Sequence, residues 1–276
     1  MNHEIAGRDI HKPWALVTGA SAGIGAEFCR QLAAMDYQLV LVARRADKLQ
    51  AVADELRDSF GSNSIIITAD LSQKDACQAI IKRLEQENIA IEYLVNNAGF
   101  GLPGSFHVPD WQAHADFIQV MMTAVCELTW RLLPGMQQSG RGFIVNVASV
   151  AGLVTPSAGH TLYGAAKSFL IKFSESLALE NDESGVKVCA LCPGFTYSEF
   201  HDVNGTREMI SKMPSFLWLD AKDVVADTLN AMSRDKVKTV VVPGTQYKII
   251  VFVYRYMPWL ASILARKTTK QYRVTE

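Results

Sequence analysis

The chain has 276 residues, of which 49% are hydrophobic and 20% charged, and its formal net charge is −1. Such a length suits one large α/β domain or two smaller domains. Because no repeat, low-complexity tract or Pro/Gly/Ser-rich linker divides the sequence, we predict a single domain over residues 1–276. The near-zero charge argues against nucleic-acid binding.

Short apolar runs alternate with helix-forming segments along the chain. We predict strands at 14–17, 38–43, 64–68, 91–96, 143–148, 187–192 and 238–242, and helices at 26–33, 47–60, 73–87, 111–137, 161–180 and 221–233. Strands that are apolar almost throughout are typical of a parallel sheet covered on both faces. With right-handed crossovers this gives a doubly wound, Rossmann-like α/β fold of seven strands, whose ligands bind at the carboxyl ends of the strands.

The first strand is followed by the glycine-rich stretch TGASAGIG, residues 18–25. Glycines at a strand-to-helix turn allow the backbone to approach a diphosphate, which the free N–H groups of the first helical turn then bind. The spacing is not the common G-x-G-x-x-G, so a plain glycine-rich turn is the alternative when this stretch is considered alone.

Polar residues follow the next strands. Arg44 and Arg45 stand where an NAD-binding protein usually has an acid, and a guanidinium there favours the 2′-phosphate of NADP; two solvated arginines are the alternative. Asp70 could accept a bond from the adenine amino group or cap the following helix. Asn97 and Gly99 belong to the stretch Asn-Asn-Ala-Gly, whose small residues suit a backbone close to a cofactor.

Three residues point to proton-transfer chemistry. Ser149 ends the fifth predicted strand, and Tyr163 and Lys167 lie four residues apart on one face of the next predicted helix. A cation within ~4–6 Å favours the phenolate and typically lowers a pKa by 1–3 units, so we expect the pKa of Tyr163 to move toward neutrality, where a phenol acts as general acid and base. Ser149 would hold the substrate oxygen.

Together, TGASAGIG, the Asn-Asn-Ala-Gly stretch, Ser149, Tyr163-x3-Lys167 and Pro193-Gly194 resemble the short-chain dehydrogenase/reductase family over about residues 13–245. The resemblance implies NAD(P)-dependent oxidoreduction of a hydroxyl or carbonyl, strand order 3-2-1-4-5-6-7, and a homo-oligomer. It implies catalysis by Ser149, Tyr163 and Lys167, and a cofactor held by Gly19, Ser21, Gly23, Ile24, Gly25, Arg44, Arg45, Asp70, Leu71, Asn97, Gly99, Tyr163, Lys167, Pro193, Gly194, Thr196 and Ser198.

One position departs from the family pattern. The family commonly has asparagine where this chain has Met121, and that asparagine supports a water-linked proton relay to the lysine. Methionine cannot donate as an amide does. Either water and a backbone carbonyl carry the relay, or turnover is slowed, or the chain is a nucleotide-binding sensor or scaffold. Because the serine, tyrosine and lysine are all present, we predict an active NADP(H)-dependent enzyme.

The last third of the sequence contains two segments rich in large apolar side chains, residues 195–218 and 246–276. Residues 195–218 contain many large apolar side chains, in the region that covers the substrate in this family, so we expect a hydrophobic, lipid-like substrate unless these side chains only cover the core. The extension 246–276 is apolar, aromatic and basic, without the ~20 apolar residues of a spanning helix. We predict peripheral membrane contact through residues 247–273; packing on the substrate cover or a neighbouring subunit is the alternative.

The sequence gives no sign of a metal centre or of secretion. No His/Cys/Asp/Glu cluster has metal-ligand spacing, and Cys189-x-x-Cys192 belongs to a strand, whose alternation points the two thiols apart. The five cysteines are scattered and odd in number, and residues 1–12 contain no apolar signal segment. We therefore expect no metal and a cytoplasmic location.

Overall fold

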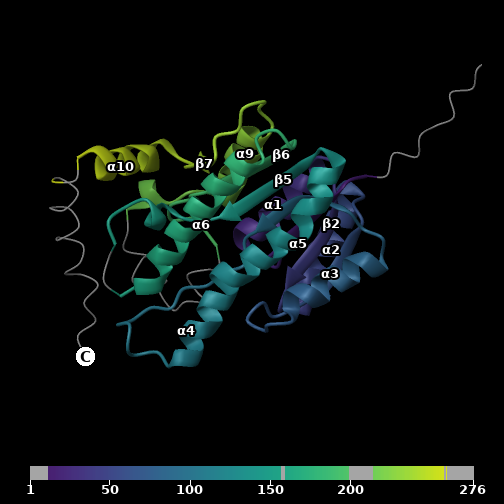
Figure 1. Cartoon of the computed structure of the whole chain (residues 1–276), viewed down its shortest axis with the longest axis horizontal. Coiled ribbons are helices and arrows are strands. Elements are labelled where there is room, and N and C mark those ends of the chain that lie inside the picture. Colours follow the sequence, from purple (N-terminus) through teal and green to yellow (C-terminus); the bar gives the residue numbers. More distant parts are fainter. Residues whose placement is uncertain (1–11, 157–158, 199–213, 258, 260–276) are drawn as a thin grey trace, which may run out of the picture.

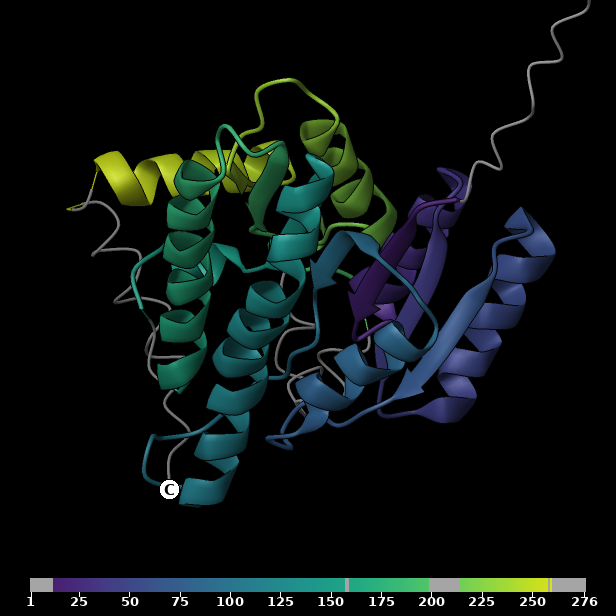
Figure 2. The same cartoon turned by 45° about the vertical axis from the view of Figure 1, so that its right-hand side comes forward.

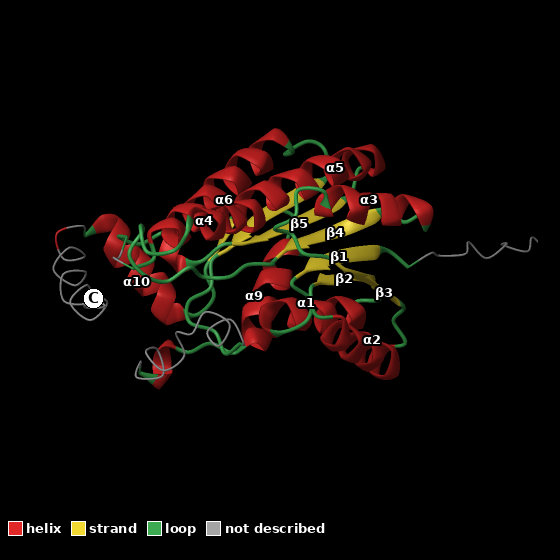
Figure 3. Ribbon diagram, turned by 90° about the horizontal axis from the view of Figure 1, so that it is seen from below, coloured by secondary structure: helices red, strands yellow, loops and turns green. Residues whose placement is uncertain are grey.

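A computed structural model describes residues 12–156, 159–198, 214–257 and 259. Its centre is one parallel sheet of seven strands in the order β3-β2-β1-β4-β5-β6-β7 (Figures 1 and 3), which confirms the predicted fold class and strand order. The strands are β1 Trp14–Thr18, β2 Gln38–Ala43, β3 Ser64–Thr68, β4 Ile91–Asn96, β5 Gly142–Val147, β6 Val186–Leu191 and β7 Val240–Val241.

Helices cover both faces of this sheet (Figures 2 and 3). One layer consists of α1 Gly23–Ala34, α2 Ala46–Phe60 and α9 Ala221–Met232, and the other of α3 Ala76–Gln86, α4 Trp111–Ile118, α5 Ala124–Ser139 and α6 Thr161–Glu180. A further helix, α10 Thr245–Tyr256, lies at the end of the molecule away from β2 and β3. The strands run between two apolar layers, which explains why they read as continuous apolar segments.

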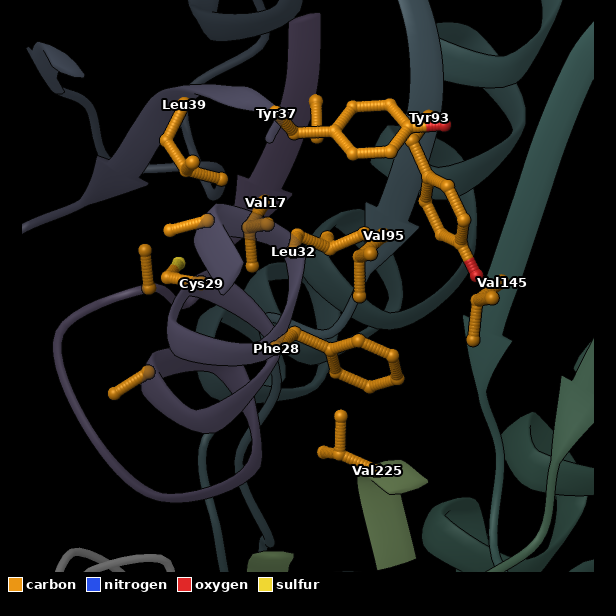
Figure 4. Close-up of a cluster of buried hydrophobic side chains, with 14 of the residues drawn as sticks. Val17, Phe28, Cys29, Leu32, Tyr37, Leu39, Tyr93, Val95, Val145 and Val225 are labelled. Carbon is orange, nitrogen blue, oxygen red and sulfur yellow. The ribbon is translucent and has the colours of Figure 1, made fainter. Parts of the chain in front are cut away.

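The larger core joins α1, α2 and α9 to the sheet. Phe28 of α1 packs in one cluster with Val95 and Val225 (Figure 4). Near the amino ends of β2 and β4, the ring of Tyr93 lies edge-on to the ring of Tyr37, with the two ring centroids 5.9 Å apart. Burying an apolar side chain as large as that of Phe28 stabilises the fold by ~1.5–3 kcal/mol. This packed core holds the strands in place, and with them the polar residues that follow their carboxyl ends.

A buried polar network fixes α6 to the sheet. The Asn96 amide donates to Asn146 Oδ1 at 2.8 Å and to Thr129 Oγ1 at 3.2 Å, and the Asn146 amide donates to Ser174 Oγ at 2.9 Å. Hydrogen bonds between buried polar groups tie β4 and β5 to α5 and α6, because an unpaired amide there would cost ~1–3 kcal/mol. Since α6 carries Tyr163 and Lys167, this network also fixes where those residues lie.

The predicted helix over 111–137 is wrong in its middle. The structure has α4, then a π-helical segment at Gln119–Thr123, then α5, which continues to Ser139. A π-helical turn inserts one extra residue into the helix and shifts the faces on either side of it. The predicted ends of several other elements also differ, by up to three residues: the helix predicted from residue 26 begins at Gly23, the helix predicted from residue 73 begins at Ala76, and β7 pairs only at Val240–Val241.

Candidate active site

A pocket of about 820 Å³ opens at the carboxyl ends of the strands. Residues that follow six strands, β1 to β6, line it, together with the start of α6 and one face of α10. Apart from Gly25, every residue predicted to bind the cofactor or act in catalysis lines this pocket. Gly25 lies behind the turn, where an added Cβ would come within 2.2 Å of the Gly19 carbonyl oxygen.

The glycine-rich turn has the backbone shape that the sequence predicts. Gly19 and Gly23 have φ values of +67° and +55°, which side chains rarely allow. At the start of α1 no side chain caps the helix, since Ala22 occupies the N-cap position. Backbone N–H groups of the first helical turn bind anions, so the turn, including Ser21 and Ile24, fits a diphosphate.

Asn97 holds the turn in place. Its amide donates to the Thr18 and Gly19 carbonyl oxygens at 2.9 and 3.2 Å, and Thr18 Oγ1 accepts from the Asn97 and Ala98 N–H groups. Gly99 leaves no room for a side chain, because an added Cβ would lie 2.7 Å from Met121 Sδ. The Asn-Asn-Ala-Gly stretch therefore supports the phosphate turn from behind as well as lining the pocket.

The end of the pocket next to β2 and β3 is basic on one side. Arg44 is exposed at its rim, and Arg45 Nη2 donates to Ser21 Oγ at 3.0 Å. Asp70 Oδ1 accepts from the Ser72 N–H at 3.0 Å and closes a local turn. The alternative that Asp70 caps α3 is wrong, since Asp75 occupies that N-cap position. Leu71 beside it is buried.

Ser149, Tyr163 and Lys167 come together in the middle of the pocket. Ser149 Oγ accepts from the Ala151 N–H at 3.1 Å and lies 3.4 Å from the Pro193 carbonyl oxygen, to which it donates. The Lys167 ammonium, in a residue only 5% exposed, donates to the Val147 carbonyl oxygen at 2.7 Å. It lies 5.5 Å from the centroid of the Tyr163 ring. A hydroxyl, a phenol and an ammonium thus face the same space.

Burial decides the protonation of these groups. It raises the pKa of Tyr163 to about 12, against the smaller lowering effect of a hydrogen bond with Ser149. It lowers the pKa of Lys167 to about 8, against the smaller raising effect of the Cys192 thiol. The expected lowering of the Tyr163 pKa is therefore not found: desolvation outweighs the cation, whose hydrogen bond goes to a backbone carbonyl. The phenol carries its proton at neutral pH.

Met121 lies behind these residues. It is 1% exposed, sits in the π-helical segment, and packs in one apolar cluster with Phe117, Ala166 and Tyr163. From the same stretch of helix, Asp116 and Val120 line the pocket. The side chain therefore fills the space beside the phenol with a thioether where the family pattern has an amide.

Sequence reasoning missed the contribution of α10. Tyr247, Ile250 and Tyr254 line the pocket, and their spacing of three and four residues places them on one helical face. That periodicity is visible in the sequence, but the sequence analysis predicts membrane contact for this segment, or packing on the substrate cover or a neighbouring subunit, and names no pocket residue in it. Of the apolar residues predicted to cover the substrate, Phe195 and Leu217 line the pocket, while residues 200, 209 and 213 lie outside the described residues.

Within the part of the chain that the structure describes, no group of three His, Cys, Asp or Glu side chains could hold a metal ion. All five cysteines are free thiols, and both Cys189 and Cys192 are buried. Over those same ranges, no helix has the length and apolar character needed to span a bilayer.

The sheet, the glycine-rich turn and the Ser149-Tyr163-Lys167 group are the features that the predicted family resemblance implies. A family model described as short chain dehydrogenase matches residues 13–208, so the chain belongs to that family, which confirms the resemblance. It is 33% identical over 195 residues to a very-long-chain 3-oxoacyl-CoA reductase of Anas platyrhynchos, covering 69% of this chain and 62% of that protein, under two thirds of its length.

Two solved structures are similar over most of the chain. A short-chain dehydrogenase from Sphingobium yanoikuyae in complex with NADPH has a TM-score of 0.78 and 32% identity, covering 96% of both chains. A bulky-bulky ketone specific alcohol dehydrogenase from Comamonas testosteroni has a TM-score of 0.74 and 28% identity, also covering 96% of both chains.

Proposed function

We propose that this protein is an NADP(H)-dependent reductase of hydrophobic carbonyl compounds. The observation that carries the proposal is the buried grouping of Ser149, Tyr163 and Lys167 on one pocket with a phosphate-binding turn. The pocket is continuous from the glycine turn to α10, so a cofactor and a substrate fit side by side.

The residues present fit a dinucleotide. The turn at Gly19–Ile24 offers backbone N–H groups to a diphosphate, and Arg44 and Arg45 stand where a 2′-phosphate would lie. Lys167 and the segment from Pro193 to Ser198 are proposed to hold the nicotinamide end. When bound, the nicotinamide supplies the hydride that the carbonyl carbon accepts. The NADPH complex of the Sphingobium relative supports the preference for NADP(H).

Each catalytic side chain has a distinct task in this proposal. Ser149 donates a hydrogen bond to the carbonyl oxygen and so orients it. The protonated phenol of Tyr163 gives its proton to that oxygen as negative charge develops there. Lys167, held by the Val147 carbonyl, places a positive charge beside the tyrosine and stabilises the phenolate that remains. Because the phenol is protonated at neutral pH, Tyr163 is in the form that the reduction step requires.

The pocket and the relatives support a bulky apolar substrate. The apolar and aromatic residues that line the pocket include Val154, Leu217, Ile250 and Tyr254. The similar proteins act, by their names, on very-long-chain 3-oxoacyl-CoA and on bulky-bulky ketones. We propose a ketone with long or bulky apolar groups on the carbonyl carbon.

A panel of such ketones, 3-oxoacyl thioesters included, tests the function by NADPH consumption. Wild-type protein should oxidise NADPH with at least one of them. Tyr163→Phe should lose the proton donor and with it about a hundredfold or more of the rate, while its NADPH affinity stays within about twofold. Unchanged turnover in this variant would refute the mechanism.

A second function rests on Met121, whose buried thioether replaces the amide of the family's relay. In that case the protein binds the nucleotide as a sensor or scaffold and turns over poorly. Tight NADPH binding without turnover across the panel would favour this function over the reductase.

We also propose that α10 places the protein on anionic membranes, and that the protein forms a homo-oligomer as its family resemblance implies. Opposite the pocket, α10 exposes Phe252 and Tyr256 by 57% and 63%, with Lys248 and Arg255 also exposed. The sequence has no acidic residue between Asp235 and Glu276. Apolar and aromatic side chains with flanking cations suit an anionic lipid surface. Residues 258 and 260–273 of the predicted membrane segment lie outside the described residues.

A further inference from the structure

Tyr247 is the most buried residue of α10 and the point where this helix meets the rest of the pocket. Its side chain is 3% exposed, and burial raises the pKa of its hydroxyl, which therefore keeps its proton. The hydroxyl accepts a hydrogen bond from the Phe195 N–H at 2.9 Å and donates one to the Leu217 carbonyl oxygen at 2.5 Å. One phenol thus joins two chain segments that are 22 residues apart.

The ring of Tyr247 also lies directly on Gly194. A Cβ added at Gly194 would come within 2.2 Å of three ring atoms. Gly194 is not one of the glycines with positive φ, so its backbone would accept an alanine if the ring were absent. Glycine is therefore required at this position by contact with Tyr247.

These contacts continue to the catalytic serine. Pro193, next to Gly194, accepts hydrogen bonds from the Ser149 hydroxyl at 3.4 Å and from the Val150 N–H at 3.1 Å. On the other side, the Leu219 N–H donates a hydrogen bond to the Phe195 carbonyl oxygen at 2.8 Å. The segment 193–195 is consequently held between Ser149 on one side and Tyr247 on the other.

We infer that Tyr247 is a positioning residue: it fixes the Pro193–Phe195 backbone and joins it to Leu217, so that α10 sets both the nicotinamide end and the substrate wall of the pocket. Tyr247 acts through Gly194 and Phe195 and needs no contact with the reacting atoms. The inference rests on the proposed function only for its cofactor and kinetic measurements.

Tyr247→Phe removes both hydrogen bonds and keeps the ring. A lost intramolecular hydrogen bond corresponds to about a two- to tenfold change in an equilibrium. We expect the Phe195 amide to exchange with solvent faster by that factor, and the Kd for NADPH and the KM for ketone to rise by a similar factor. The pH profile of kcat should not move, because Tyr163 and Lys167 are untouched.

Tyr37→Phe is the matched control. Tyr37 is also buried, and its hydroxyl donates to Glu92 at 2.6 Å, but it directly precedes β2 and does not line the pocket. This variant should lose thermal stability while leaving the Phe195 amide and the NADPH affinity unchanged. Equal effects of both variants, or an unaltered Phe195 amide in Tyr247→Phe, would overturn the positioning role.

A double-mutant cycle tests the ring contact. In the wild-type background, Gly194→Ala should lower the unfolding temperature and weaken NADPH binding. In a Tyr247→Ala background the same change should have a much smaller effect, so that the factor by which it raises the Kd for NADPH differs between the two backgrounds by at least about fivefold. Equal effects of Gly194→Ala in both backgrounds would contradict the inference. If the wild type binds no NADPH, the proposed function fails, and amide exchange and the coupling in unfolding temperature still decide the role of Tyr247.

Discussion

Lys167 and Tyr163 show at the residue scale how burial can oppose a favourable charge pair. A cation beside a phenol would make the phenol more acidic, but both groups are removed from water, and desolvation favours the neutral form of each. Here it brings the pKa of Lys167 down to about 8 and that of Tyr163 up to about 12. Between these values the phenol is protonated and the amine is not.

The pH dependence of reduction follows from this order. Lys167 is charged below its pKa of about 8 and loses its proton above it, whereas Tyr163 keeps its proton until about 12. We expect kcat/KM for ketone reduction to be highest on the acid side of 8 and to fall as the pH rises past it. Lys167→Arg, whose guanidinium stays charged, should abolish the fall in whatever activity remains. A profile that rises through pH 8 would contradict the assignment.

The proposed preference for NADP(H) depends on Arg44, which is exposed at the rim of the pocket. A charge-assisted bond to the 2′-phosphate is worth ~1.5–3 kcal/mol, so Arg44→Ala should weaken NADPH binding about ten- to a hundredfold and leave NADH binding nearly unchanged. Titration of wild-type and variant protein with NADPH and with NADH measures the Kd for each cofactor. Arg57→Ala removes an exposed arginine from the far end of α2 and serves as the charge control. Equal losses for NADPH and NADH would show that Arg44 does not contact the phosphate.

At the scale of the element, the π-helical segment explains how methionine is accommodated. The extra residue in Gln119–Thr123 turns Met121 toward Gly99, Ala166 and Tyr163, while Val120 reaches the pocket. Such single π-turns occur often at functional sites. The π-helical turn thus places Met121 against α6, the helix that carries Tyr163, although the methionine side chain is apolar.

Met121→Asn tests whether an amide can work at this place. We expect activity to be kept or raised, because the side chain lies beside Tyr163, and stability to fall by ~1–3 kcal/mol, because a polar group is buried in an apolar cluster. Met121→Leu keeps the cluster apolar and is the control. The comparison uses pH profiles and unfolding temperatures of the three proteins. An asparagine variant that remains folded but inactive would contradict the expectation.

The sequence predicted most elements but not the details that depend on packing. Strand β4 and the turn after it could be predicted because continuous apolar residues and small polar residues have direct local meanings. The π-helical segment has no such signal, since the sequence around Met121 is compatible with an ordinary helix. The pKa of Tyr163 could not be predicted either, because it depends on how completely other parts of the chain cover the phenol. The inner face of α10 was missed because its spacing fits a pocket wall and a surface helix equally well.

At the scale of the whole molecule, α10 has two different faces. Tyr247, Ile250 and Tyr254 line the pocket, while Phe252 and Tyr256 are exposed. Figures 1 and 3 place this helix at the edge of the molecule on the β7 side. An apolar substrate leaving a lipid surface bound to the outer face would reach the pocket along the same helix.

Membrane binding is tested with the full chain. We expect the protein to sediment with anionic vesicles at low salt, less at high salt, and little with neutral vesicles. Replacing Phe252 and Tyr256 together by serine should weaken binding about tenfold or more, and should leave turnover of a water-soluble ketone unchanged, because neither residue lines the pocket. Absence of binding at low salt would leave α10 as a pocket wall alone.

The place of α10 in the chain has a consequence for how the protein is made. Synthesis proceeds at ~5–20 residues per second, and amino-terminal parts fold first. Thr245–Tyr256 follow all seven strands, so the glycine turn, the serine and the tyrosine-lysine pair can assemble before Tyr247 is available to join Phe195 to Leu217. A nascent chain would therefore hold its glycine turn and its catalytic side chains before Tyr247 fixes the backbone of residues 193–195. A premature stop codon just ahead of Thr245 would leave a product with the complete sheet and an unfinished pocket.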